Sequence, residues 1–155
     1  LSCLDEEILH KMKESGCIRV KVGIESGNER RLKEINKGIT PAFVMEKTKM
    51  IRDAGMSFAA YFMIGFPGET DEEAKETIEL AKRVEADYYS LSICAPYYGT
   101  KIYEDFLSDS EKENIKHHWE YFFHQSDEMV LTSKISKPVL EEFLSLNEYG
   151  KGRRI

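Results

Sequence analysis

The chain has 155 residues, of which 41% are hydrophobic, and it carries a formal net charge of −6. This hydrophobic fraction supports a folded core and excludes wholesale disorder, while the acidic balance argues against nucleic acid as a partner. No apolar run approaches the roughly 20 residues of a membrane span, so we expect a cytoplasmic protein with no signal peptide and no membrane partner.

The three cysteines, Cys3, Cys17 and Cys94, are too few and too scattered for a disulfide framework or a metal knuckle. We expect free thiols in a reducing compartment. The chain begins at Leu1 and runs directly into a helical pattern, and we interpret it as a fragment of a longer protein.

The first half of the chain is expected to alternate between helix and strand. Apolar residues recur at helical spacing up to Gly16, which is typical of a helix end. Thr40 followed by Pro41 is a strong helix start, an N-cap with proline in the first turn. The predicted elements are a helix at 4–16, a strand at 17–25, a short charged helix at 29–36 and a helix at 41–54.

Residues 59–64 are all apolar or aromatic and predict a buried strand that ends at Gly65. Thr70 and Glu73 have the spacing of a capping box that begins the next helix, and Ser110 with Glu113 has the same spacing. The remaining predicted elements are a helix at 70–85, a strand at 88–95, helices at 101–107 and 110–124, a short strand at 129–132 and a helix from 136 to 149.

This order predicts an α/β fold with parallel strands and right-handed crossovers. Three strands are too few to close a barrel, so we expect a parallel-stranded arc of a partial TIM-type barrel, incomplete as a fragment. Residues 1–107 would form three strand-plus-helix units and residues 108–155 a helical C-terminal extension. A complete small three-layer domain is the alternative. An arc would expose an edge along the strand at 19–24, through which the fragment would self-associate.

Each of the three predicted strands ends in an unusual loop. The loops are GIESG at 23–27, GFPGET at 65–70 and PYYGT at 96–100. Glycine lets the backbone approach a ligand closely, and the carboxyl ends of parallel strands are where ligands bind in such sheets. Three such loops in successive units predict one ligand pocket at this end of the sheet.

In their order and spacing, GIESG followed by LKEINKGIT, FMIGFPGET and PYYGT resemble the second half of the radical S-adenosylmethionine (SAM) barrel. The resemblance covers residues 4–103 and is greatest to the group whose relatives carry an N-terminal cobalamin-binding domain. That group includes methyltransferases, methylthiotransferases and the anaerobic oxidative cyclase of magnesium-protoporphyrin IX monomethyl ester. The resemblance implies a parent enzyme, an Fe–S oxidoreductase or methyltransferase, that uses SAM, a [4Fe–4S] cluster and, in this group, sometimes cobalamin.

By the same resemblance, Glu25 matches the polar residue that contacts the ribose or methionine part of SAM, with Ser26 beside it. Physically, a carboxylate can accept hydrogen bonds from hydroxyls or an ammonium group. The alternative is an ion pair with Lys21, Arg30 or Lys37. Lys37 itself matches a basic residue that reaches the SAM carboxylate, or else it is a solvated helix end.

Met63 matches the strand position whose backbone borders the adenine ring, and at Gly65 the nucleotide could pass without a Cβ in the way. Pro67 and Gly68 would set the turn. We expect Glu69 to cap the following helix, where its charge suits the dipole. The alternative is a core strand followed by an ordinary turn.

On the third strand, the stretch from Ile93 to Pro96 would supply an apolar wall to the cofactor, and Tyr97 would lie near the substrate. Outside this pocket, His117, His118 and His124 are expected on one helix. The spacing from His117 to His124 does not suit a metal pair. No catalytic residue and no metal ligand is assigned.

The chain departs from the resembled family in its cysteines. A [4Fe–4S] cluster in that family is held by a C-x3-C-x2-C loop, and no such spacing occurs here. We therefore expect the fragment alone to be inactive, supplying SAM-binding strand ends and the substrate side to a barrel whose N-terminal half lies elsewhere. The alternative function is a stand-alone, non-catalytic binding or scaffold domain.

Overall fold

Three parallel strands form one sheet in the order β1-β2-β3. β1 (Arg19–Glu25) pairs with β2 (Ser57–Ile64), and β2 pairs with β3 (Tyr88–Ile93). The computed structural model describes residues 1–118 and 134–148. The predicted parallel α/β fold is therefore confirmed, with each strand within two residues of its expected bounds.

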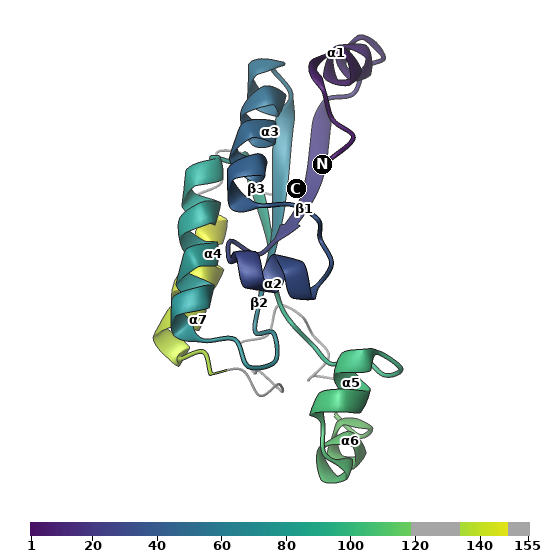
Figure 1. Ribbon diagram of the computed structural model, residues 1–155, viewed down its shortest axis with the longest axis vertical. Coiled ribbons are helices and arrows are strands. Elements are labelled where there is room, and N and C mark those ends of the chain that lie inside the picture. Colours follow the sequence, from purple (N-terminus) through teal and green to yellow (C-terminus); the bar gives the residue numbers. More distant parts are fainter. Residues whose placement is uncertain (119–133, 149–155) are drawn as a thin grey trace.

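The strands are joined by helices that run back along the sheet (Figure 1). The predicted strand at 129–132 and the later parts of two predicted helices lie outside the described residues. The helices are α1 (Glu6–Glu14), α2 (Glu29–Glu34), α3 (Pro41–Asp53), α4 (Asp71–Val84), α5 (Lys101–Phe106), α6 (Asp109–Ile115) and α7 (Lys137–Ser145), followed by the 3-10 turn η2 (Leu146–Glu148).

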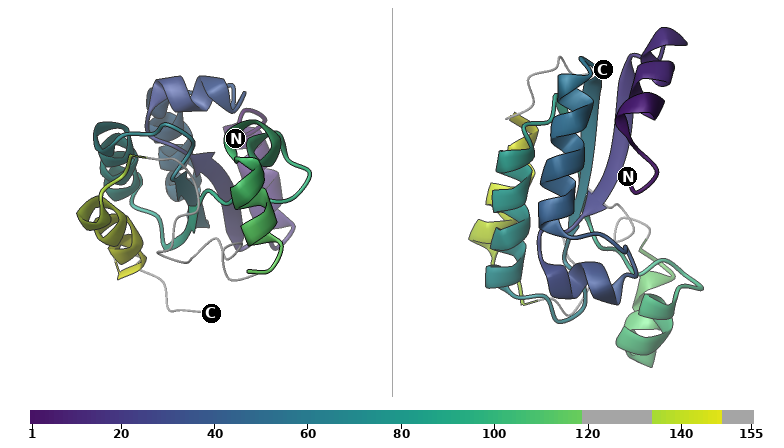
Figure 2. Two further views of the ribbon diagram at one scale, coloured as in Figure 1. Left: turned by 90° about the horizontal axis from the view of Figure 1, so that it is seen from below. Right: turned by 45° about the horizontal axis from the view of Figure 1, so that its top comes forward.

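One face of the sheet is covered by helices. Alternate strand residues, such as Val22, Phe58, Phe62 and Leu91, are buried in the main core, because successive side chains of a strand point to opposite faces. α3 and α4 contact β2, and η2 contacts β3. Figure 2 shows α4 and α7 together on one side of the sheet, away from α5.

Two helix starts show how local sequence places these elements. Thr40 accepts a hydrogen bond from the Phe43 amide and begins α3, as predicted. The expected cap of the helix near residue 110 is wrong, because Ser108 with Glu111 caps α6 instead. The chain leaves α5 in extended backbone at Leu107, so the first serine with a glutamate three residues later becomes the N-cap.

α6 ends at Ile115, so His117 and His118 follow this helix and do not lie on it, and His124 is outside the described residues. The expectation of three histidines on one helix is therefore wrong for the first two. No helix in the described part of the chain has the length and apolar character that a membrane crossing requires.

Candidate functional site

The three predicted loops lie together at the end of the sheet where the strands finish. In the register of the sheet, Glu25 lies opposite Phe62, and Ile64 lies opposite Ile93. The last residue of β1 therefore lies beside β2 two residues before its end, and the last residues of β2 and β3 lie opposite each other. α2, the turn between β2 and α4, and α5 are at this end, the lower end of the sheet in Figure 1. We call this end the rim.

Glu25 and Lys37 form an ion pair at the rim. Lys37 Nζ lies 2.9 Å from Glu25 Oε1, and the two side chains are 31% and 25% exposed, respectively. Of the three cations considered as partners for Glu25, Lys37 is the one that pairs with it. Glu25 has a left-handed backbone (φ 72°) at a register shift of β1, which turns its side chain from the regular strand direction.

The space for this pair depends on Gly23. A Cβ at Gly23 would lie 2.6 Å from Glu25 Oε1 and 3.1 Å from Lys37 Nζ. The carboxylate and the ammonium group therefore lie over the backbone of β1, in the space that a side chain at position 23 would occupy. The result is a partly exposed pair of opposite charges at the end of a strand.

The turn after β1 is packed against α4. Ser26 is fully buried, and its hydroxyl lies 3.1 Å from the Thr77 hydroxyl, which also accepts a hydrogen bond from the Gly27 amide. A Cβ at Gly27 would lie 2.3 Å from the Glu76 carbonyl oxygen. Ser26 thus ties the rim to α4, whereas Glu25 beside it lies at the rim surface.

The turn after β2 is organised by Glu69, and the expectation that this residue caps α4 is wrong. Thr70 is the N-cap of α4, while Glu69 folds back so that its Oε2 accepts hydrogen bonds from the amides of Gly65 (2.6 Å) and Phe66 (3.0 Å). Gly65 and Gly68 have positive φ angles of 87° and 68°, which permit this reversal.

Glu69 is a buried carboxyl with one oxygen unused. The residue has no exposed surface, and its Oε1 has no hydrogen-bond partner among the described residues. Burial raises the pKa of Glu69 to about 7, against the lowering effect of the hydrogen bonds from the Phe66 and Gly65 amides. The turn therefore contains a carboxyl group that exchanges its proton near neutral pH.

The β3 side of the rim is mostly apolar. Ile93 and Pro96 are buried, whereas Tyr97 is 46% exposed. A second core cluster lies here, with Met63 packed against it. It contains Phe66, Cys94, Tyr103, Leu107 and Ile115. Burial and the nearby Glu69 raise the pKa of the Cys94 thiol to about 12, so this cysteine remains a neutral thiol.

Arg31 is the rim residue that sequence reasoning missed. It is only 3% exposed and binds both Glu73 in α4 and the Pro67 carbonyl in the β2 turn. In the sequence it stands beside Arg30, which is exposed. Nothing in the charged pattern of residues 29–34 distinguishes the two arginines, so no local signal could have found it.

The cysteines do not fit an iron–sulfur cluster. Cys3 is exposed, Cys17 is half-buried and Cys94 is buried beyond the end of β3, so they lie on separate segments. Across residues 1–118 and 134–148, no group of three or more His, Cys, Asp or Glu side chains is placed to hold a metal ion.

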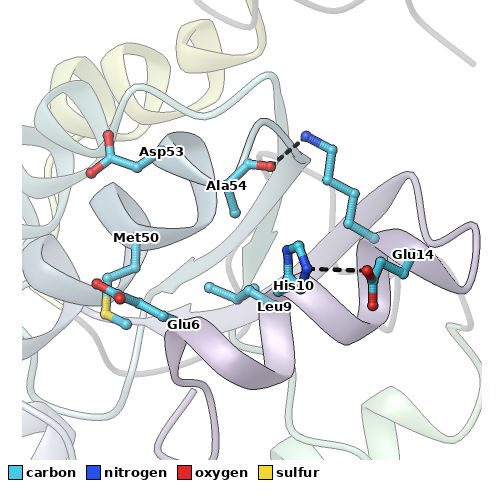
Figure 3. A pocket seen from close by; sticks show the side chains of 8 residues that line it. Glu6, Leu9, His10, Glu14, Met50, Asp53 and Ala54 are labelled. Atoms are coloured by element: carbon cyan, nitrogen blue, oxygen red, sulfur yellow. Dashed lines mark hydrogen bonds and ion pairs between the residues drawn. The ribbon is translucent and has the colours of Figure 1, made fainter.

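A groove of about 610 Å³ lies away from the rim, between α1 and the C-terminal half of α3 (Figure 3). Glu6 and His10 from α1 and Met50 and Asp53 from α3 line it. At one end, Lys13 Nζ donates a hydrogen bond to the Ala54 carbonyl (2.7 Å), which caps α3. The groove is at the end of the sheet where the strands begin, so it plays no part in the rim.

Comparison with known proteins places this geometry in a family. The family model for the Radical SAM superfamily matches residues 2–81. An uncharacterized methyltransferase of Pyrococcus horikoshii is 40% identical over 104 residues, which are 67% of this chain and 23% of that protein. The anaerobic magnesium-protoporphyrin IX monomethyl ester cyclase of Cereibacter sphaeroides is 26% identical over 69% of this chain and 18% of its own length.

A solved structure shows the same fold. Coproporphyrinogen III oxidase from Escherichia coli, described as a radical SAM enzyme, superposes with a TM-score of 0.58. The superposition covers 77% of this chain and 30% of that one at 16% sequence identity. The chain spans about a quarter of the length of the curated relatives it matches.

Proposed function

This chain belongs to the radical SAM superfamily, and from that membership we propose that its rim binds SAM within an enzyme of the methyltransferase or methylthiotransferase type. The observation that carries the proposal is the Glu25–Lys37 pair over Gly23. The methionine part of SAM is a zwitterion. Its ammonium group can donate to the Glu25 carboxylate, and its carboxylate can accept from Lys37.

The ion pair suits exchange with such a ligand. Each partner is a quarter to a third exposed, so a ligand can reach both without opening the core. When the ligand binds, the single contact between Glu25 and Lys37 is replaced by two, one from Glu25 to the ligand ammonium group and one from Lys37 to the ligand carboxylate. When no ligand is bound, the two side chains hold each other in place.

The β2 turn suits the nucleoside side of the ligand. Gly65 has no Cβ, and Glu69 holds the Gly65 and Phe66 amides in a fixed direction. The Oε1 of Glu69, on the same carboxyl group, is buried and has no hydrogen-bond partner among the described residues. In this proposal the backbone of Met63 and Gly65 borders the adenine ring, Pro67 and Gly68 shape the turn, and Ile93 and Pro96 close the apolar side.

The superfamily uses a [4Fe–4S] cluster to cleave SAM, and the cysteines of this chain do not fit that cluster. We therefore propose that the cluster ligands belong to polypeptide outside these 155 residues, and that the chain alone binds SAM without cleaving it. Tyr97, exposed beyond the end of β3, is our candidate for contact with the substrate. We assign no residue of this chain to cobalamin, which some relatives in the proposed group use.

The test is calorimetric titration of the chain with S-adenosylhomocysteine, which shares the amino-acid and nucleoside parts of SAM. We expect Glu25→Gln and Lys37→Met each to weaken binding about tenfold or more, because a hydrogen bond to a charged group is worth about 1.5–3 kcal/mol. The exposed pair of Lys33 and Glu29 on α2, 3.9 Å apart, is the matched control. Glu29→Gln and Lys33→Met should leave the affinity unchanged.

Two results would contradict the proposal. One is a wild-type chain that folds and binds no S-adenosylhomocysteine, which would favour a non-catalytic binding or scaffold domain. The other is equal binding by the Glu25 variant and the Glu29 control.

A further inference from the structure

Arg31 is a buried cation at the centre of the rim. Arginine is rarely buried unless it is paired, and Arg31 at 3% exposure makes four hydrogen bonds. Its Nε and Nη2 donate to Glu73 Oε2 at 3.2 and 2.8 Å, and its Nη1 donates to Glu34 Oε2 at 2.9 Å. Nη1 also donates to the Pro67 carbonyl oxygen at 3.0 Å.

These bonds connect three separate segments. Arg31 is on α2, which follows the β1 turn, Glu73 is in the first turn of α4, and Pro67 is in the turn after β2. Glu73 Oε2 also accepts from the Thr70 amide at 3.2 Å, where the β2 turn enters α4. One guanidinium therefore holds the β2 turn at its middle directly and at its end through Glu73.

The turn needs such a restraint. Pro67 stands between two glycines with positive φ, Gly65 and Gly68, and glycine leaves the backbone many accessible conformations. Glu69 fixes the amides at the start of the turn. Arg31 fixes the Pro67 carbonyl in the middle of the turn. Glu69 therefore restrains backbone N–H groups of the turn, and Arg31 restrains a backbone C=O group.

Arg30 is a natural comparison on the same helix. It also donates to Glu73, with its Nε 2.8 Å from Oε1, but its side chain is 54% exposed and no bond to the β2 turn is found among the described residues. The two arginines therefore share two acids, Glu73 and Glu34, and differ in burial and in the contact with Pro67.

We propose that Arg31 is a positioning residue that holds the β2 turn in the conformation that receives the adenosyl group. The inference rests on the proposed function, since it assumes that the turn borders SAM. Arg31 acts through the Pro67 carbonyl and does not touch the ligand. The affinity for the ligand is proportional to the fraction of molecules whose turn is already in the competent conformation. Loss of the restraint lowers this fraction and so weakens binding without removing any ligand contact.

The planar fork of arginine is required for this role. Donors on different edges of the planar guanidinium reach Glu73 and Pro67 together, and a lysine ammonium group on its flexible stem does not reproduce that geometry. Arg31→Lys therefore keeps the charge and loses the restraint, which separates positioning from simple charge balance.

The experiment compares Arg31→Lys, Arg31→Met and Arg30→Met with the wild-type chain. Each is titrated with S-adenosylhomocysteine, and amide hydrogen exchange is measured at Gly65, Phe66 and Glu69. We expect both Arg31 variants to bind S-adenosylhomocysteine about tenfold more weakly, because the loss of one hydrogen bond to a charged group changes an affinity by about that factor. Exchange should quicken at these three amides and stay unchanged in the strands. Arg30→Met should match the wild type in both measurements.

Wild-type affinity in Arg31→Lys, or unchanged exchange in the turn, would overturn the inference. Equal acceleration of exchange in β1, β2 and β3 would also overturn it, because that result indicates a general structural role. If Arg31→Met does not fold, Arg31→Lys carries the test. If the wild-type chain binds no nucleoside while the turn still loosens in the Arg31 variants, the proposed function fails and the restraint stands.

Discussion

The buried carboxyl of Glu69 makes the stability of this fold depend on pH in an unusual direction. Its pKa rises from 4.5 to about 7 on folding. The folded state keeps the Glu69 proton to a higher pH than the unfolded state does. The contribution of this proton to the free energy of unfolding is therefore fully present below pH 4.5 and is lost as the pH rises through 7. A pKa difference of this size corresponds to about 3 kcal/mol.

The neighbouring charges do not titrate in the same interval. Burial pushes the pKa of Glu73 up, but hydrogen bonds from Arg31 and Arg30 outweigh it, so its pKa lies below the ordinary value. The Cys94 thiol, with a pKa of about 12, stays neutral. Of these three described groups, Glu69, Glu73 and Cys94, the carboxyl of Glu69 is therefore the one expected to titrate between pH 5 and 8.

Urea unfolding at pH 5, 6, 7 and 8 tests this prediction. We expect the free energy of unfolding to fall by about 2.5 kcal/mol from pH 5 to 8 in the wild-type chain, since part of the effect is already lost between pH 4.5 and 5. Glu69→Gln should remove most of that slope, since its amide oxygen can accept from the same two backbone amides and does not ionise. Glu72→Gln, at an exposed position in the first turn of α4, is the control and should keep the wild-type slope.

A wild-type stability that is constant or rises from pH 5 to 8 would refute the reasoning. An equal slope in Glu69→Gln and the wild type would refute it as well, because the dependence would then come from another group.

Three further predictions concern the rim and the sheet edge. Gly23→Ala should displace the flexible Glu25 carboxylate and weaken S-adenosylhomocysteine binding by calorimetry, with stability retained. Gly27→Ala places a Cβ against the Glu76 backbone, so unfolding free energy should fall by about 1–3 kcal/mol in urea. We also propose that the chain self-associates through the outer edge of β1, so light scattering should show a mass that rises with concentration, whereas a monomer throughout would contradict it.

Local sequence patterns determined the elements and their arrangement. The apolar run at 59–64, the Thr40–Pro41 helix start and the alternation of helix with strand predict parallel pairing, which the structure confirms. These signals work because backbone hydrogen bonding and burial depend on residues close in the chain. The loop motifs, by resemblance, also identified the family that the comparison shows.

The partners of the rim side chains were decided by the tertiary structure. Arg31 meets Glu73 and Pro67 across separations of 42 and 36 residues, and Glu25 is neutralised by Lys37 after the chain has passed through α2. Glu69 turns inward because the folded turn presents two backbone amides to it, although its position in the sequence suits a helix cap. A carboxylate or a guanidinium can bind many donors or acceptors, and only packing determines which of them comes within reach.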